Sequence, residues 1–151
     1  MIGNDLVDLE QAAIESNWKR KGYLAKIFTP SEQLMIDSSV MVWLLWSMKE
    51  AAYKIYSRQT GIRNYAPTSL NCSEINYDEF HITGIVKIEE RFFFTQSLFK
   101  DSYVYTTAAL SIEALSTIKT VIYQFPHHQF DYKITLPKCV SHHGKYLALA
   151  Y

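Results

Sequence analysis

The chain has 151 residues, of which 48% are hydrophobic and 20% are charged. Such a length and composition suit one soluble globular domain, and we expect a single domain spanning residues 1–151. Fifteen basic residues balance fifteen acidic ones, which argues against a protein that binds nucleic acid through a global positive field.

Neither a membrane span nor a secretion signal is expected. The longest strongly apolar run, VMVWLLW at 40–46, is far shorter than the roughly 20 residues that cross a bilayer. The first residues, MIGNDLVDLE, carry acids where a signal peptide carries basic residues. Cys72 and Cys139 match no metal-binding spacing, so we expect reduced, packed thiols in a cytoplasmic protein.

The first sixty residues have the pattern of helices. Apolar residues recur at helical spacing over 8–28, where Gly22 is expected to end or bend the helix. A long, mostly buried helix is expected over 40–58, with Gly61 beyond its end. Another helix is expected to start between these two segments. Thr29 is its N-cap, Pro30 fits its first position, and Glu32 completes a capping box with Thr29.

From residue 69 onward the chain is rich in β-branched and aromatic residues, several of them in period-two alternation. The expected strands lie at 69–77, 81–96, 102–111, 117–125, 130–137 and 146–151, with 111–115 as a turn. Helices followed by strands indicate an α+β fold with an antiparallel sheet. Eleven tyrosines and eight phenylalanines suggest bulky sheet faces or a surface shared with another chain.

The segment IGNDLVDLE places Asp5 and Asp8 three residues apart behind Gly3. If a helix begins here, both carboxylates lie on roughly one face, and paired oxygen ligands suit a hard cation such as Mg²⁺. The alternative is that Asp5 is an N-cap and Asp8 a favourable acid in the first helical turn. This segment alone favours the capping alternative.

A second candidate is WSMKEAAYKI at 46–55. Glu50 and Lys54 stand four apart on a helix, which by itself favours an ordinary surface ion pair. However, Trp46 and Ala51 look buried, and a charge in such surroundings needs a specific partner. With Lys49 close by, the group could hold a metal and a phosphate together.

The third candidate is the segment CVSHHGKYLALAY at the end of the chain. Residues 141–145 are predicted to form a polar turn before an apolar strand, and such a loop suits phosphate or ribose contacts. The alternative is an ordinary hairpin turn. His127 and His128 form a similar pair, which we interpret as a surface loop.

Together these motifs resemble the 4′-phosphopantetheinyl transferase superfamily, most closely its short holo-acyl-carrier-protein-synthase type. The motifs are GNDLVD, then FT..E, W..KEA..K, TGI, and SH before the terminal YLALAY. WSMKEAAYK is the most specific of them, and GNDLVD supports it at the expected distance upstream. The resemblance implies an α+β fold in which N-terminal helices pack on an antiparallel β-sheet.

The resemblance also implies a reaction: transfer of the 4′-phosphopantetheine arm of coenzyme A to a serine of an apo carrier protein, with release of adenosine 3′,5′-bisphosphate. Asp5 and Glu50 match the ligands of the catalytic Mg²⁺. Lys54 matches a catalytic lysine that contacts the coenzyme A phosphates near the incoming serine. Further matches to coenzyme A contacts are Lys49, Gly61, Arg63, Ser141 and His142.

Two departures from the family pattern keep other readings open. Val7 stands where two-domain members carry a second acid, and Leu45 stands where short members often have an arginine. A non-catalytic relative that binds coenzyme A or a carrier protein is therefore the second hypothesis. In a third, the charges at Lys49, Glu50 and Lys54 are only surface ion pairs.

The resemblance bears on partners as well. Long members contain two similar halves with the site between them, so we expect this chain to form a homo-oligomer, a trimer, with His142 and Glu50 meeting across subunits. Family carriers are usually acidic, and the basic segment NWKRKGYLAK at 17–26 is the candidate surface for one. The alternative for that segment is a plain solvated helix face.

Overall fold

The computed structural model describes residues 1–124 and 131–151, so the expected loop at His127 and His128 lies outside the described residues. The helices are α1 (Leu9–Glu15), α2 (Tyr23–Ile27), α3 (Pro30–Met35), α4 (Ser39–Thr60) and α5 (Ile112–Ser116). The strands are β1 (Ile2–Asp8), β2 (Leu70–Tyr77), β3 (Ile82–Ile88), β4 (Arg91–Lys100), β5 (Tyr103–Ala109), β6 (Thr120–Gln124), β7 (Cys139–His143) and β8 (Tyr146–Ala150). Among the described residues, no helix has the length and apolarity to cross a membrane.

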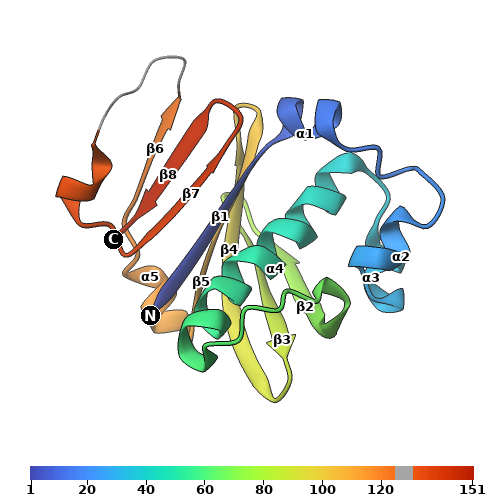
Figure 1. The fold of residues 1–151 in the computed structure, drawn as a ribbon, viewed down its shortest axis with the longest axis horizontal. Helices are drawn as coiled ribbons and strands as arrows, with labels where there is room; N and C mark the ends of the chain where they lie inside the picture. The colour runs from blue at the N-terminus through green and yellow to red at the C-terminus, as the bar shows by residue number, and fades with distance from the viewer. Residues whose placement is uncertain (125–130) are drawn as a thin grey trace.

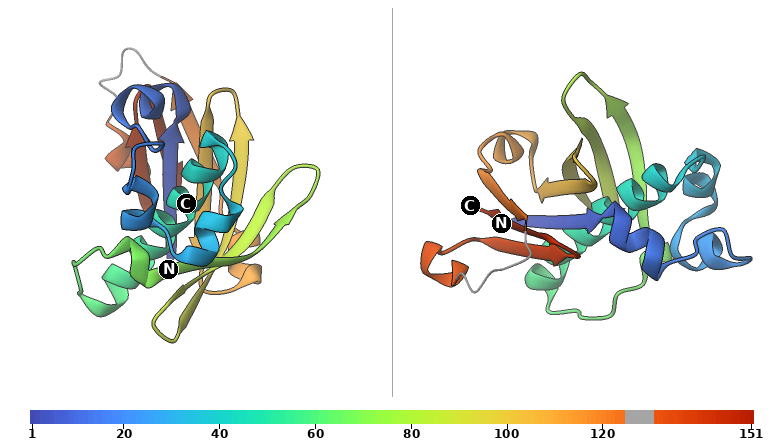
Figure 2. Two further views of the ribbon diagram at one scale, coloured as in Figure 1. Left: turned by 90° about the vertical axis from the view of Figure 1, so that its right-hand side faces the viewer. Right: turned by 90° about the horizontal axis from the view of Figure 1, so that it is seen from above.

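Two antiparallel sheets build the fold, as the α+β prediction requires. The larger has the strand order β1-β5-β4-β3-β2, and the smaller has the order β6-β8-β7. Helix α4 crosses one face of the larger sheet, and the smaller sheet stands beside β1 (Figure 1). Figure 2 shows the β2–β3 hairpin extending away from the smaller sheet. The chain is therefore arranged around β1, which α4, β5 and β7 all contact.

The helix predictions from local signals are confirmed. Thr29 and Glu32 form a complete capping box at the start of α3. The predicted long helix is α4, which ends at Gly61 in the left-handed region with φ 73°. The expected helix over 8–28 is divided into α1 and α2, because a turn with Gly22 at φ 83° separates them.

The helical interpretation of the first residues is wrong, because residues 2–8 form strand β1. All seven residues of β1 are buried, and the strand pairs with β5 along its whole length. Side chains alternate between the two faces of a strand. Gly3 faces α4, so Asp5, two residues on, lies on the same face, whereas Asp8 lies on the opposite face and caps α1.

Three other predictions are corrected. Residues 112–116 form helix α5 rather than a turn, because Ser111 provides an N-cap by accepting a hydrogen bond from the Ala114 N–H. Tyr132–Thr135 forms a short 3₁₀ helix where a strand was expected, since the Asp131 side chain caps it. The polar turn expected over 141–145 contains fewer residues than predicted, because the residues up to His143 belong to β7.

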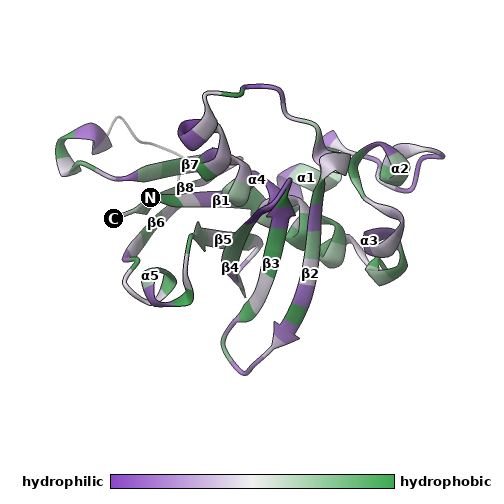
Figure 3. Ribbon diagram, turned by 90° about the horizontal axis from the view of Figure 1, so that it is seen from below, coloured by the Kyte–Doolittle hydropathy of each residue, from purple (hydrophilic) through white to green (hydrophobic). Residues whose placement is uncertain are grey.

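The main core lies between α4 and the larger sheet. Strand β3 alternates buried and more exposed side chains, and Figure 3 shows hydropathy changing along the neighbouring strands. Cys72 and Cys139 are both free and buried, as predicted. The backbones of β1 and α4 approach each other closely at Gly3. A Cβ atom added there would collide with the Ala51 carbonyl oxygen, so this approach requires a glycine.

We predict that Gly3→Ala destabilises the protein far more than Gly84→Ala, because the two new methyl groups meet different obstacles. The Gly3 methyl meets helix backbone, and overpacking of this kind costs about 1–3 kcal/mol or more. The Gly84 methyl meets the end of the Met48 side chain, which can move. Urea unfolding of both variants measures the difference, and equal losses would contradict this account.

Candidate active site

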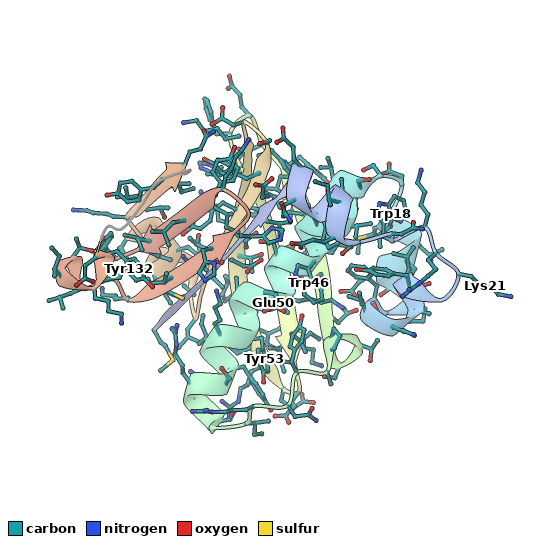
Figure 4. The ribbon with its side chains drawn as sticks, turned by 45° about the horizontal axis from the view of Figure 1, so that its top comes forward. Trp18, Lys21, Trp46, Glu50, Tyr53 and Tyr132 are labelled. Carbon is teal, nitrogen blue, oxygen red and sulfur yellow. The ribbon has the colours of Figure 1, made fainter. Side chains whose placement is uncertain are left out.

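A cleft of about 310 Å³ lies where β1, α4 and β7 meet beside α1. Asp5 from β1, Glu50 from α4 and His142 from β7 all line it. Figure 4 shows Glu50 and Trp46 on the outward side of α4, and Trp46 is also a wall of the cleft. These predicted residues come together within one chain, so the expected meeting of His142 and Glu50 across subunits is not needed to form this cleft.

The Asp5 carboxyl group is held in an unfavourable environment for a charge. Its pKa is raised to about 7, mainly by burial and in part by the nearby Glu50 carboxylate, although Lys54, Ser47 and Ser141 act in the opposite direction. Its Oδ2 atom is buried and has no hydrogen-bond partner among the described residues. The site therefore contains a carboxylate oxygen that would gain from a bound cation.

Burial also raises the pKa of Glu50, although Lys54 and Tyr65 lower it. The Tyr65 ring packs on Trp46 at 5.8 Å and on Tyr53 at 4.8 Å between ring centroids. Its hydroxyl has no hydrogen-bond partner of good geometry among the described residues, yet it is close enough to influence Glu50. Sequence reasoning missed Tyr65, because a single tyrosine in a loop gives no signal of its own.

Lys54 connects β1 and β7 from one turn beyond Glu50 on α4. Its ammonium group donates to the Asn4 carbonyl at 2.6 Å and to the Val140 carbonyl at 3.3 Å. These bonds use two of its three N–H donors. Arg58, one further turn along α4, donates in the same way to the Ile2 carbonyl at 2.6 Å. Lys54 thus places a positive charge beside the carboxylates and anchors β1, which carries Asp5, and β7, which carries His142.

Side chains of β7 satisfy the N–H groups on the same edge of β1. Ser141 Oγ accepts a hydrogen bond from the Leu6 N–H at 3.1 Å. Two residues on, His143 Nδ1 accepts one from the Asp8 N–H at 2.9 Å. We call this line of contacts between β1 and β7, with Lys54 and Arg58, the β1 seam. Ser141 and His143 face the seam, and His142 between them is exposed; both histidines line the cleft.

Asp8 is an anchor on the other face of β1. Its Oδ1 accepts from the Glu10 and Gln11 N–H groups, and its Oδ2 accepts from the Lys145 N–H at 3.1 Å. Both oxygens are thus engaged in capping α1 and in holding the β7–β8 turn. Both alternatives from the sequence are corrected: Asp8, not Asp5, is the N-cap of α1, and Asp5 lies on the other face of strand β1.

Lys49 does not join the cleft, although the resemblance implied a cofactor contact. Its side chain is 0% exposed and pairs with Glu32 at 2.6 Å. It also donates to the Ile27 and Pro67 carbonyls at 2.8 Å, so all three of its N–H donors are used. The second Glu32 oxygen accepts from the Cys72 N–H. This buried network joins α3, α4 and β2.

Gly61 and Arg63 lie outside the cleft, beyond the far end of α4. Gly61 follows Glu50 by eleven positions, or about 16 Å along the helix axis. Both residues are exposed, and only Tyr65 from this loop reaches Glu50. Leu45 is fully buried, so no cofactor contact comes from the position where short family members often have an arginine.

The donor set of the cleft fits a divalent cation of the Mg²⁺ type. Mg²⁺ is usually held by one or two carboxylates and completes its shell with water and substrate phosphates. Asp5 and Glu50 are two such carboxylates, and Asp5 Oδ2 lacks a partner. Over residues 1–124 and 131–151, no group of three or more His, Cys, Asp or Glu residues could hold a metal. Water and substrate would have to supply the other ligands.

We predict that Asp5→Asn stabilises the protein increasingly as the pH rises. The pKa of Asp5 is 3.8 in its ordinary state and about 7 when folded, so the stability due to its bound proton is lost as the pH rises through 7. The difference in unfolding free energy between the variant and the unaltered protein should grow by roughly 2–3 kcal/mol from pH 5 to pH 8. Urea titrations at both pH values test this, and parallel pH profiles would contradict it. Added Mg²⁺ should stabilise the unaltered protein at pH 8 but not the variant.

We also predict that Lys49→Met costs roughly 3–5 kcal/mol of stability, because it leaves the Glu32 carboxylate buried without its cation. Adding Glu32→Gln should recover part of this loss, since glutamine keeps an acceptor for the Cys72 N–H and carries no charge. A double-mutant cycle measured by urea unfolding gives the coupling. Strictly additive losses would show that the pair is not coupled.

A family model described as the 4′-phosphopantetheinyl transferase superfamily matches residues 1–108. No curated protein and no solved structure matches the chain. The matched residues include Asp5, Glu50 and Lys54 and end before β7, which carries Ser141 and His142. The chain belongs to the 4′-phosphopantetheinyl transferase superfamily and has a role in phosphopantetheine transfer.

Proposed function

We propose that this protein is a holo-acyl-carrier-protein synthase. It transfers the 4′-phosphopantetheine arm of coenzyme A to a serine of an apo carrier protein and releases adenosine 3′,5′-bisphosphate. The observation that carries the proposal is the meeting of Asp5 and Glu50 in one cleft, with Lys54 beside them. Family membership supplies the class of reaction, and these charges supply groups suited to it.

The transfer forms one bond and breaks one bond at phosphorus. The serine oxygen bonds to the phosphorus that carries pantetheine, and the bond from that phosphorus to the bridging pyrophosphate oxygen breaks. Asp5 and Glu50 would hold Mg²⁺, which supplies charge stabilisation to the phosphates when bound. The Glu50 carboxylate, whose pKa is raised by burial, is suited to accept the serine proton. The Lys54 ammonium stabilises negative charge as it develops on the leaving oxygen.

Coenzyme A is long enough to extend beyond the cleft. His142 lies exposed at the rim and is placed to contact it. The loop from Gly61 to Tyr65 runs back from the far end of α4 to Glu50, which supports contacts of Gly61 and Arg63 with the distant part of the cofactor. Lys49 is left out of this set because it is buried.

An acidic carrier protein would dock beside the mouth of this cleft. Ser16 and Tyr23 line the cleft and flank an exposed basic loop. Figure 4 shows Lys21 of this loop extending outward. The basic side chains of the proposed surface are Lys19, Arg20, Lys21 and Lys26. Charge complementarity of this kind speeds association and selects partners.

We further propose a cytoplasmic homo-oligomer, most simply a trimer. Free buried thiols suit a reducing compartment. Exposed aromatic side chains on the larger sheet, such as Phe92 at 53% exposure, suit an interface between copies. Light scattering measures the assembly, and a monomer that still transfers the arm would contradict this part.

The decisive assay mixes the protein with coenzyme A, Mg²⁺ and apo carrier proteins, and mass spectrometry detects the added arm. We expect Glu50→Gln to lower the rate by roughly 10²–10³-fold, because the variant removes a charge at the reacting phosphates. EDTA should abolish transfer and added Mg²⁺ should restore it. Glu113→Gln on α5, whose side chain is exposed outside the cleft, is the matched control and should transfer normally.

Other outcomes separate the alternatives. Coenzyme A binding without transfer to fatty-acid, polyketide or peptide-synthesis carriers would indicate a non-catalytic relative. Absence of any coenzyme A binding would leave Lys54 with a structural role alone, as the anchor of β1 and β7 on α4.

A further inference from the structure

Ser141 has a hydroxyl group whose hydrogen-bond direction is fixed by its neighbours. The residue is 7% exposed and lies in the β1 seam, where its hydroxyl group contacts the β1 main chain and the Asp5 side chain. Its oxygen accepts from the Leu6 N–H, which can only donate. The single hydroxyl proton is therefore available to Asp5, and Ser141 Oγ donates to Asp5 Oδ1 at 3.3 Å.

Ser47 holds the same residue from the opposite side. It comes from α4, is 0% exposed, and donates to the Asp5 main-chain carbonyl at 3.3 Å. With Oδ1 engaged by Ser141, Oδ2 is the oxygen that lacks a partner among the described residues. Ser141 thus leaves one defined oxygen of Asp5 for another ligand, while Ser47 fixes the main chain of the same residue.

We propose that Ser141 and Ser47 are positioning residues that orient the Asp5 carboxylate for a divalent cation. The inference rests on the proposed function, because it takes Asp5 as a metal ligand. It assigns Ser141 a role different from the coenzyme A contact that the family resemblance implied. Hydrogen-bonded partners of ligating carboxylates fix the ligand geometry, and their loss typically costs 10–100-fold in metal affinity.

The test measures Mn²⁺ binding to the full chain by electron paramagnetic resonance, without coenzyme A. Ser141→Ala and Ser47→Ala should each weaken Mn²⁺ binding by about 10–100-fold. Ser141→Thr keeps the hydroxyl and should bind close to the unaltered protein. Thr95→Val is the matched control, because it removes a buried hydroxyl bond, to the Gly84 carbonyl, from strand β4, which does not line the cleft. It should bind Mn²⁺ normally.

The inference is overturned if folded Ser141→Ala and Ser47→Ala bind Mn²⁺ as tightly as the unaltered protein. It is also overturned if Ser141→Ala weakens only coenzyme A binding, measured calorimetrically in EDTA, since Ser141 would then be a cofactor contact. If Ser141→Ala fails to fold, Ser47→Ala decides, because it leaves the Leu6 N–H bond intact. Asp5→Ala tests the proposed function separately: unchanged Mn²⁺ binding there would reject the metal site itself.

Discussion

On one edge of β1, the main-chain N–H and C=O groups form hydrogen bonds with side chains instead of with a neighbouring strand. The geometry of the active site depends on these bonds. Buried main-chain N–H and C=O groups need partners, and β5 provides them on one edge only. On the other edge, Ser141 and His143 accept from β1, whereas Lys54 and Arg58 donate to it. Such contacts keep β7 close to β1 without a continuous ladder. The cleft forms beside this seam.

The seam also explains how buried carboxylates are tolerated. Burial raises the pKa of both Asp5 and Glu50, the Glu50 carboxylate adds to the rise at Asp5, and Lys54 lowers both pKa values only in part. The Lys54 ammonium is held by main-chain carbonyls of β1 and β7, so it cannot turn away to solvent without losing those bonds. The fold therefore stores an electrostatic cost at the cleft that a bound cation would relieve. Costs of this kind concentrate at functional sites.

Features set by neighbouring residues could be predicted from the sequence, whereas features set by distant pairing could not. The capping box at Thr29 is local, so the start of α3 was predicted correctly. Strand β1 was missed because its partners lie about a hundred residues away at 103–109 and because both its faces are buried, which removes the alternation that marks a strand. Asp5 could be identified from the motif, but its separation from Asp8 follows only from the strand. Tyr65 reaches Glu50 through the path of a loop, which no residue pattern encodes.

Lys49 and Glu50 show how one helix divides its charges between stability and function. Successive residues on a helix are turned by about 100° from each other, so adjacent side chains face different surroundings. Lys49 is directed at α3 and β2, where Glu32 and two carbonyls engage its ammonium completely. Glu50 is directed at the cleft, where it meets Asp5 and Lys54. The adjacent pair in the KEA motif therefore has two separate tasks: the lysine fixes α4 against the rest of the fold, and this rigid support holds the glutamate at the cleft.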